Sequence, residues 1–196
     1  QDTLNIGYTG SLQKGKGIEL IIPLAKRLKH CRFHIIGGTD EQIATIKKQH
    51  PDTKNVLFYG HIPHYQVAEH LEKYDIVLAP YQGNVLSIDE KFEISKWMSP
   101  LKIFEYMAAG KPIIASKLPA IEEVLTHQRN CLLCDHENID QWVESIERLG
   151  VDKVLTEKLS KNALTDFTDN YTWNARATKI TQNILLKTNQ NQKPIV

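Results

Sequence analysis

The chain has 196 residues, of which 41% are hydrophobic, so it is long enough for one globular domain with a substantial core. Its 24 basic and 23 acidic side chains leave a net charge of +1, so we expect no nucleic-acid partner. No apolar run is long enough to span a bilayer and no signal peptide opens the chain. Three cysteines are too few for a disulfide framework and favour a reducing compartment. We therefore expect a cytoplasmic protein, free or at the cytoplasmic face of the membrane.

Apolar strand-like runs alternate with helical patterns along the chain, which is typical of βαβ units around a parallel sheet. The sequence predicts an α/β fold, a Rossmann-like doubly wound parallel sheet over residues 1–187, with a polar tail over residues 188–196. A loop is predicted over Tyr81–Met98, and a loop of that length is usually functional. In chain order, the predicted strands are Leu4–Thr9, Arg32–Ile36, Val56–Tyr59, Asp75–Ala79, Ile113–Ala115 and Cys131–Cys134, and the predicted helices are Gly17–Leu28, Asp40–Gln49, Val67–Lys73, one that begins at Pro100, Ala120–Leu125, Ile139–Leu149, Asp152–Phe167 and Trp173–Leu186.

The helix that begins at Pro100 combines an anion site, a cation and a carboxylate. Proline suits the first helical position, which makes Ser99 a natural N-cap. Free N–H groups and the positive end of the helix dipole can bind phosphate there. Lys102 in the first turn is unfavourable to the dipole unless it serves an anion, and Glu105 follows one turn later. The alternative interpretation is an ordinary capped helix with both side chains in solvent.

The segment Gly10-Ser-Leu-Gln-Lys-Gly-Lys16-Gly17 links the first strand to the first helix and nearly spells a P-loop. Gly17 has no hydroxyl for Mg²⁺ and no later strand ends in a suitably placed aspartate, which disfavours an NTPase. The glycines still allow close approach of a ligand, and Lys16 offers a point charge to a diphosphate. The alternative is a glycine-rich turn with a solvated Lys16. Ligands of open α/β sheets lie beyond the carboxyl ends of the strands, where this segment and the Ser99 segment both fall.

A zinc site is the other chemistry that the sequence suggests, since His127, Cys131, Cys134 and His136 lie close together in the chain. Residues three apart in a strand point to opposite faces of the sheet, so Cys131 and Cys134 cannot both reach one metal ion. We therefore expect buried thiols and no metal site.

The motif Ser99-Pro-Leu-Lys-x-x-Glu-Tyr-Met-Ala-x-Gly-Lys-Pro resembles the nucleotide-sugar signature of the retaining glycosyltransferases of family 4 (group 1), which have the GT-B fold. Lys16-Gly17 after the first strand and Tyr171-Thr-Trp173 before the last helix are also similar to that family's patterns. The resemblance extends from Leu4 to about Trp173. It implies the C-terminal, donor-binding half of a GT-B enzyme.

The resemblance also implies roles for individual residues. Lys16 and Lys102 would be catalytic, because they neutralise the leaving diphosphate, and Glu105 would hold the ribose hydroxyls. The Gly60-His-Ile-Pro-His64 turn follows the third strand. His61 and Ile62 in this turn would line the base pocket, and His64 is expected to cap the following helix. The donor-binding set is thus Gly10, Ser11, Lys16, His61, Ile62, Ser99, Pro100, Leu101, Lys102 and Glu105.

Two positions depart from the family's pattern. Ser11 stands where many members have arginine, and Trp97 fills the position of a glutamate that usually contacts the donor sugar. The contacts that those two family residues make with the donor are therefore not assigned to any residue of this chain.

By resemblance, the full enzyme would transfer a sugar with retention from a nucleotide diphosphate sugar to an acceptor saccharide or lipid-linked glycan, in bacterial polysaccharide biosynthesis. No metal or other cofactor is expected, because the sequence has no Asp-x-Asp motif. No initiator methionine precedes Gln1, so we expect an N-terminal GT-B domain to be missing, the fragment alone to be inactive, and any peripheral membrane contact to involve that half. Two alternatives stay open: the sugar-nucleotide domain of a GT-B epimerase, and a non-catalytic doubly wound binding module.

Overall fold

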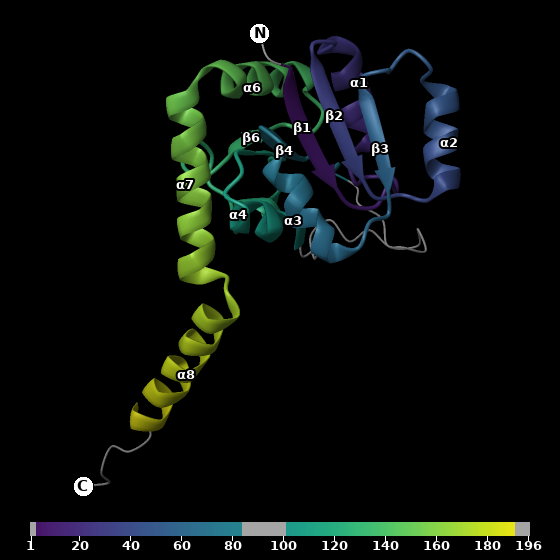
Figure 1. Cartoon of the computed structure of the whole chain (residues 1–196). Coiled ribbons are helices and arrows are strands. Elements are labelled where there is room, and N and C mark those ends of the chain that lie inside the picture. The colour runs from purple at the N-terminus through teal and green to yellow at the C-terminus, as the bar shows by residue number, and fades with distance from the viewer. Residues whose placement is uncertain (1–2, 84–100, 191–196) are drawn as a thin grey trace, which may run out of the picture.

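The chain folds around a parallel β-sheet, as Figure 1 shows for a computed structural model that describes residues 3–83 and 101–190. The sheet has six strands in the order β3-β2-β1-β4-β5-β6, and every neighbouring pair is parallel. This order reverses direction between β1 and β4, which makes that point the topological switch of the sheet. The strands are β1 (Leu4–Thr9), β2 (Cys31–Ile36), β3 (Val56–Gly60), β4 (Ile76–Ala79), β5 (Ile113–Ser116) and β6 (Leu132–Cys134).

Helices cover both faces of this sheet, so the predicted doubly wound α/β fold is confirmed. The last helix, α8, extends away from the sheet beyond the end of α7 (Figure 1). Within the described ranges no helix is long and apolar enough to cross a bilayer. The helices are α1 (Ile18–Arg27), α2 (Asp40–Gln49), α3 (His64–Glu72), α4 (Leu101–Ala108), α5 (Pro119–Glu122), α6 (Ile139–Val151), α7 (Lys153–Asn170) and α8 (Trp173–Gln190).

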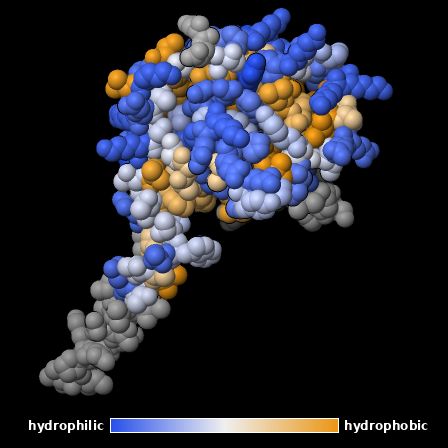
Figure 2. All heavy atoms as spheres, in the orientation of Figure 1, coloured by the Kyte–Doolittle hydropathy of each residue, from blue (hydrophilic) through white to orange (hydrophobic). Residues whose placement is uncertain are grey.

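Two hydrophobic cores form because successive side chains of each strand point to opposite faces. In β4, Ile76 and Leu78 belong to a core that α1, α2 and α6 cover, whereas Val77 and Ala79 belong to a core that α3, α4 and α5 cover. Both cores are closed to solvent. Figure 2 shows that the outer surface in this view is mostly hydrophilic, with apolar side chains in small patches.

Several boundaries differ from the sequence prediction, and the largest differences are at helix ends, including that of α7, which ends at Asn170 and not at Phe167. Helix α3 begins at His64, because Pro63 at the N-cap has a φ of −57°, which already suits a helix start. Helix α5 ends at Glu122, and the chain continues to Leu125 in turns. Helix α8 continues to Gln190, past the predicted end at Leu186 and into the predicted tail, since no glycine or proline interrupts it.

The cysteines behave as the strand pattern predicts. Cys131 packs in the core beneath α4 and α5, and Cys134 packs in the core on the opposite face. Cys134 Sγ lies 3.2 Å from Ser145 Oγ. Across residues 3–83 and 101–190, no three His, Cys, Asp or Glu side chains converge as a metal ion would require.

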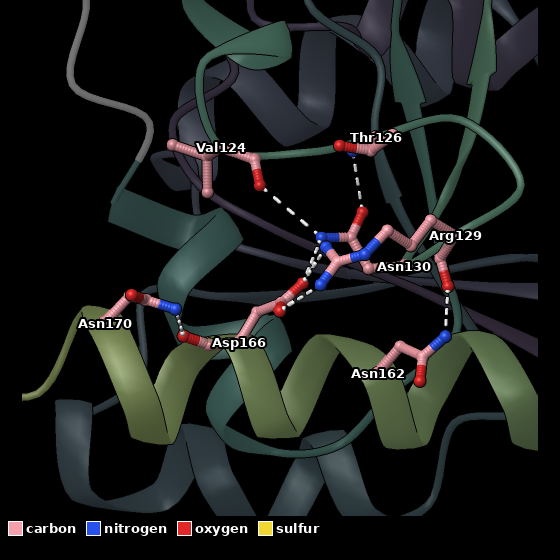
Figure 3. A network of polar contacts seen from close by, with 7 residues as sticks. All are labelled: Val124, Thr126, Arg129, Asn130, Asn162, Asp166 and Asn170. Atoms are coloured by element: carbon pink, nitrogen blue, oxygen red, sulfur yellow. Dashed lines mark hydrogen bonds and ion pairs between the residues drawn. The ribbon is translucent and has the colours of Figure 1, made fainter.

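A polar network attaches α7 to the loop that precedes β6 (Figure 3). Arg129 donates two hydrogen bonds to the Asp166 carboxylate, at 2.6 and 2.7 Å, and the fully buried Asn130 donates a third at 2.8 Å. Asn130 Oδ1 also accepts a hydrogen bond from the backbone N–H of Thr126 at 2.8 Å. The Asp166 carboxylate therefore accepts hydrogen bonds from the buried amide of Asn130 and from the guanidinium of Arg129 at the same time.

Asp166→Ala should lower the free energy of unfolding by about 2 kcal/mol near neutral pH, because a buried donor loses its acceptor. Desolvation opposes ionisation of Asp166, but hydrogen bonds from Arg129 and Asn130 outweigh it and lower the pKa of this carboxyl. The stabilisation is therefore complete above the ordinary pKa of about 3.9 and is lost as the pH falls through the lower folded value. Urea unfolding of the wild type and of Asp166→Ala at neutral and acidic pH measures this difference in the free energy of unfolding. Asp169→Ala, exposed on the same helix, is the control and should cost little; equal losses in both variants would refute the role of the network.

Candidate functional site

A cavity of about 740 Å³ lies at the carboxyl edge of the sheet, beside the switch between β1 and β4. Ser99 and Pro100, the expected N-cap and first helical position, lie outside the described residues. The cavity is lined by every other residue predicted to bind the donor: Gly10, Ser11, Lys16, His61, Ile62, Leu101, Lys102 and Glu105.

The glycine-rich loop of residues 10–17 is held by bonds within the protein. Gly10 N–H donates to the carbonyl of Ile36 at 2.9 Å. The Glu19 carboxylate accepts from the N–H groups of Gly15 and Gly17, at 2.8 and 3.3 Å. In a P-loop the backbone N–H groups of the loop face the phosphates, whereas two of those groups are already taken here. These two N–H groups are therefore not free to contact a phosphate, whereas Lys16 lines the cavity.

Lys102 occupies an unusual position for a lysine. It is the second residue of α4 and only 8% exposed, and its Nζ lies 3.9 Å from the ring centroid of Tyr8 and 4.6 Å from that of Tyr81. Among the described residues Nζ has no hydrogen-bond partner. An unpartnered buried amine is costly, so a hydrogen-bond acceptor beside Nζ would stabilise Lys102.

The surroundings of Lys102 disfavour the charged form of its amine. Burial first, and then the nearby Lys16, hold the pKa of Lys102 well below its ordinary range, with Glu105 acting in the opposite direction. An anion in the cavity would reverse both effects, because it supplies an opposite charge and hydrogen-bond acceptors.

Lys16 brings a second cation to the same cavity. Its Nζ lies 5.8 Å from the centroid of the Tyr81 ring, and partial burial lowers the pKa of this lysine as well. Tyr81 thus faces both amines. Two like charges near one cavity repel each other until an anion lies between them, so the pair is suited to a ligand with more than one negative charge.

Glu105 places a carboxylate in the wall of the same cavity. Its Oε1 lies 3.1 Å from His64 Nε2, and its side chain is 33% exposed. The prediction that His64 caps α3 is wrong: Pro63 takes the N-cap position, His64 is the first residue of the helix, and its ring contacts Glu105. Glu105 keeps acceptor capacity for hydroxyl groups of a ligand.

The remaining wall combines the predicted His61 and Ile62 with residues that the sequence analysis did not single out. Ile62 and Val67 give it an apolar patch beside the exposed His61. The rule that strand ends form the site would have indicated most of the others, because they end β1 or β2 or follow β2 or β4 within a few residues. These additional lining residues are Thr9, Gln13, Ile36, Gly37, Gly38, Thr39, Gln42 and Tyr81.

Together these features define a parallel α/β domain whose switch-point cavity is lined by two lysines and one glutamate carboxylate. Comparison with known families gives the class: the family described as "Glycosyl transferases group 1" matches residues 3–152. The chain belongs to the group 1 glycosyltransferases, and its sheet is the Rossmann-like α/β unit of their GT-B fold.

Among curated proteins, an uncharacterized glycosyltransferase from Methanocaldococcus jannaschii is 25% identical over 177 residues, which are 88% of this chain and 42% of that protein. The chain therefore spans less than half the length of this relative.

Solved structures have the same fold. A C-terminal domain of a group 1 glycosyltransferase (LpcC) from Francisella tularensis aligns with a TM-score of 0.66 at 21% identity, covering 87% of both chains. Anabaena HepE in complex with UDP and glucose aligns with a TM-score of 0.76 at 17% identity, covering 93% of this chain and 48% of that one. Sucrose-phosphate synthase from Thermosynechococcus elongatus aligns with a TM-score of 0.76 at 21% identity, covering 96% of this chain and 46% of that one.

Proposed function

We propose that this chain is the donor-binding domain of a retaining glycosyltransferase, and that its cavity holds the nucleotide diphosphate of a nucleotide sugar. The observation that carries the proposal is the buried Nζ of Lys102, which has no hydrogen-bond partner among the described residues and lines the same cavity as Lys16. A diphosphate would supply acceptors and negative charge to both amines.

The two lysines would act on the leaving group. Negative charge builds up on the diphosphate as the bond to the sugar breaks, and cations already fixed beside it stabilise that charge without reorganisation. No metal or other cofactor is needed for this step in our proposal. Lys16 and Lys102 are therefore proposed as the catalytic contribution of this domain.

The nucleoside end would extend away from the lysines. Glu105 would accept hydrogen bonds from two ribose hydroxyls, and the base would lie against Ile62 and His61. Relatives of the same fold support a nucleotide sugar as the ligand, since HepE is described with UDP-glucose and Staphylococcus aureus TarM with UDP and alpha-GlcNAc-glycerol.

The rest of the enzyme would supply the acceptor side of the reaction. We propose an N-terminal GT-B domain as partner, an acceptor saccharide or lipid-linked glycan, and a place at the cytoplasmic side of the membrane in bacterial polysaccharide biosynthesis. Without that partner the domain should bind donor and not transfer the sugar, because transfer requires both substrates to be positioned together.

Calorimetric titration tests the diphosphate site. UDP, GDP and ADP are compared with uridine, guanosine and adenosine, and with the 2′-deoxy diphosphates. The best diphosphate should bind more tightly than its nucleoside, and Lys16→Ala should weaken it by about 1.5–3 kcal/mol. The 2′-deoxy form should bind less tightly, and Glu105→Gln should reduce that difference. Equal affinities for diphosphate and nucleoside in all three pairs would overturn the proposal.

A further inference from the structure

Tyr8 connects the two lysines of the cavity. The residue lies on β1, is 1% exposed, and does not line the cavity itself. Its hydroxyl lies 2.8 Å from the carbonyl oxygen of Ser11 and 3.1 Å from that of Lys16, so it reaches both ends of the glycine-rich loop. Its ring lies 3.9 Å from Lys102 Nζ.

The hydroxyl is held as a donor. Burial first, with smaller effects from Tyr106, Tyr81 and Glu19, raises the pKa of Tyr8 well above its ordinary value. The hydroxyl therefore keeps its one proton and shares it between the carbonyl oxygens of Ser11 and Lys16, which neither an ionised tyrosine nor a phenylalanine could do.

The aromatic ring of Tyr8 lies directly against the amine of Lys102. An ammonium over the face of an aromatic ring is attracted by the ring's quadrupole, and burial strengthens this attraction. Gly10 makes the approach possible, because a Cβ atom at that position would lie 2.9 Å from Lys102 Nζ and 3.2 Å from the Tyr8 hydroxyl. One side chain thus touches the backbone of the first lysine and the amine of the second.

We propose that Tyr8 is a positioning residue that sets both lysines for the diphosphate, Lys16 through its hydroxyl and Lys102 through its ring. This inference rests on the proposed function, since it assumes that the two lysines bind a diphosphate. It adds a residue that lies behind the cavity wall and that no comparison assigns.

Tyr8→Phe separates the two contacts, because it removes the hydroxyl and keeps the ring. The readout is the ratio of the affinities for the diphosphate and its nucleoside, using whichever of UDP, GDP and ADP binds the wild type best. We expect this ratio to fall about tenfold while the nucleoside affinity stays unchanged. A general loss of structure would weaken both ligands together. Tyr74→Phe is the matched control: this buried tyrosine packs against Gly7 and has its hydroxyl 3.3 Å from His70, so the ratio should not change.

Double variants identify the lysine through which the hydroxyl acts. In a Lys16→Ala background Tyr8→Phe should cause no further loss, whereas in a Lys102→Met background its full effect should remain. Should Tyr8→Phe fail to fold by thermal denaturation, 4-fluorophenylalanine at position 8 fills the space of the hydroxyl without donating, and the same ratio is measured. An unchanged ratio in the folded variant would overturn the role of the Tyr8 hydroxyl and leave the proposed function standing. A wild type without any preference for diphosphates would instead overturn the proposed function.

Discussion

Lys102→Met should remove most of the affinity for a nucleoside diphosphate and at the same time make the fold more stable. The loss of affinity should be about 2–3 kcal/mol, or about 30- to 150-fold, because a charge-assisted contact in a buried position disappears. Stability should rise by about 1 kcal/mol, because methionine fills a similar volume between Tyr8 and Tyr81 without an unpartnered amine. Titration calorimetry and urea unfolding measure the two effects on the same samples.

The gain in stability should depend on pH in a defined direction. The pKa of Lys102 is lower in the folded protein than in the unfolded chain, so the unfolded state binds a proton more strongly. The wild type therefore loses stability as the pH falls below the ordinary lysine pKa of about 10.4. The advantage of Lys102→Met should be present near neutral pH and vanish as the pH rises above that value.

Lys111→Met is the matched control for this prediction. Its Nζ donates to the carbonyl oxygens of Glu72 and Tyr74 at 2.8 and 2.9 Å, so this lysine is partnered. The substitution should lower stability and leave diphosphate affinity unchanged, which is the opposite pattern. If Lys102→Met behaved like Lys111→Met, Lys102 would be a structural residue and not part of the anion site.

Gly37→Ala should disrupt both the fold and the cavity. A Cβ atom at Gly37 would lie 2.0 Å from the carbonyl oxygen of Gly10, and the residue has a φ of +118°. The backbone would have to move, so we expect a loss of about 3–5 kcal/mol in the free energy of unfolding. Because Gly10 lines the cavity, diphosphate affinity should fall in whatever fraction stays folded.

Gly60→Ala provides the comparison, because the N–H of Gly37 donates to the carbonyl of Gly60 and the two lie side by side. Gly60 also has a positive φ, +67°, but the nearest atom to an added Cβ, Ile43 Cδ1, is 3.9 Å away. Gly60→Ala should therefore lower the free energy of unfolding only through backbone strain, by about 1 kcal/mol. Chemical denaturation of both variants decides the point: similar losses would show that strain, and not the contact with Gly10, governs Gly37.

The amino-acid sequence was sufficient for the sheet and for most of the cavity. Alternating apolar runs such as Ile76 to Ala79 predict buried parallel strands, and parallel strands bring their carboxyl ends to one edge. That rule alone places Gly10, Lys16 and the start of α4 together.

The environment of Lys102 could not be predicted in the same way. The helical period puts Lys102 on the face of Ile103, Tyr106 and Met107, but lysine is rarely buried, so the sequence suggests a solvent-exposed amine. Its two aromatic contacts come from β1 and from the residue after Pro80, which are far apart in the sequence. The prediction that His64 caps α3 is wrong for a related reason. Capping rules consider only nearby residues, whereas the partner of His64 is Glu105, which is 41 residues away.

The bonds from Glu19 to the glycine-rich loop affect how a ligand can be recognised. Since the N–H groups of Gly15 and Gly17 are occupied within the protein, the loop keeps its shape without a ligand. Ordering a flexible segment on binding costs about 1–2 kcal/mol of backbone entropy per residue, and this loop avoids that cost because it is ordered during folding. In the proposed function the cavity is thus a preorganised receptor, in which the lysine side chains act as point charges toward the anion.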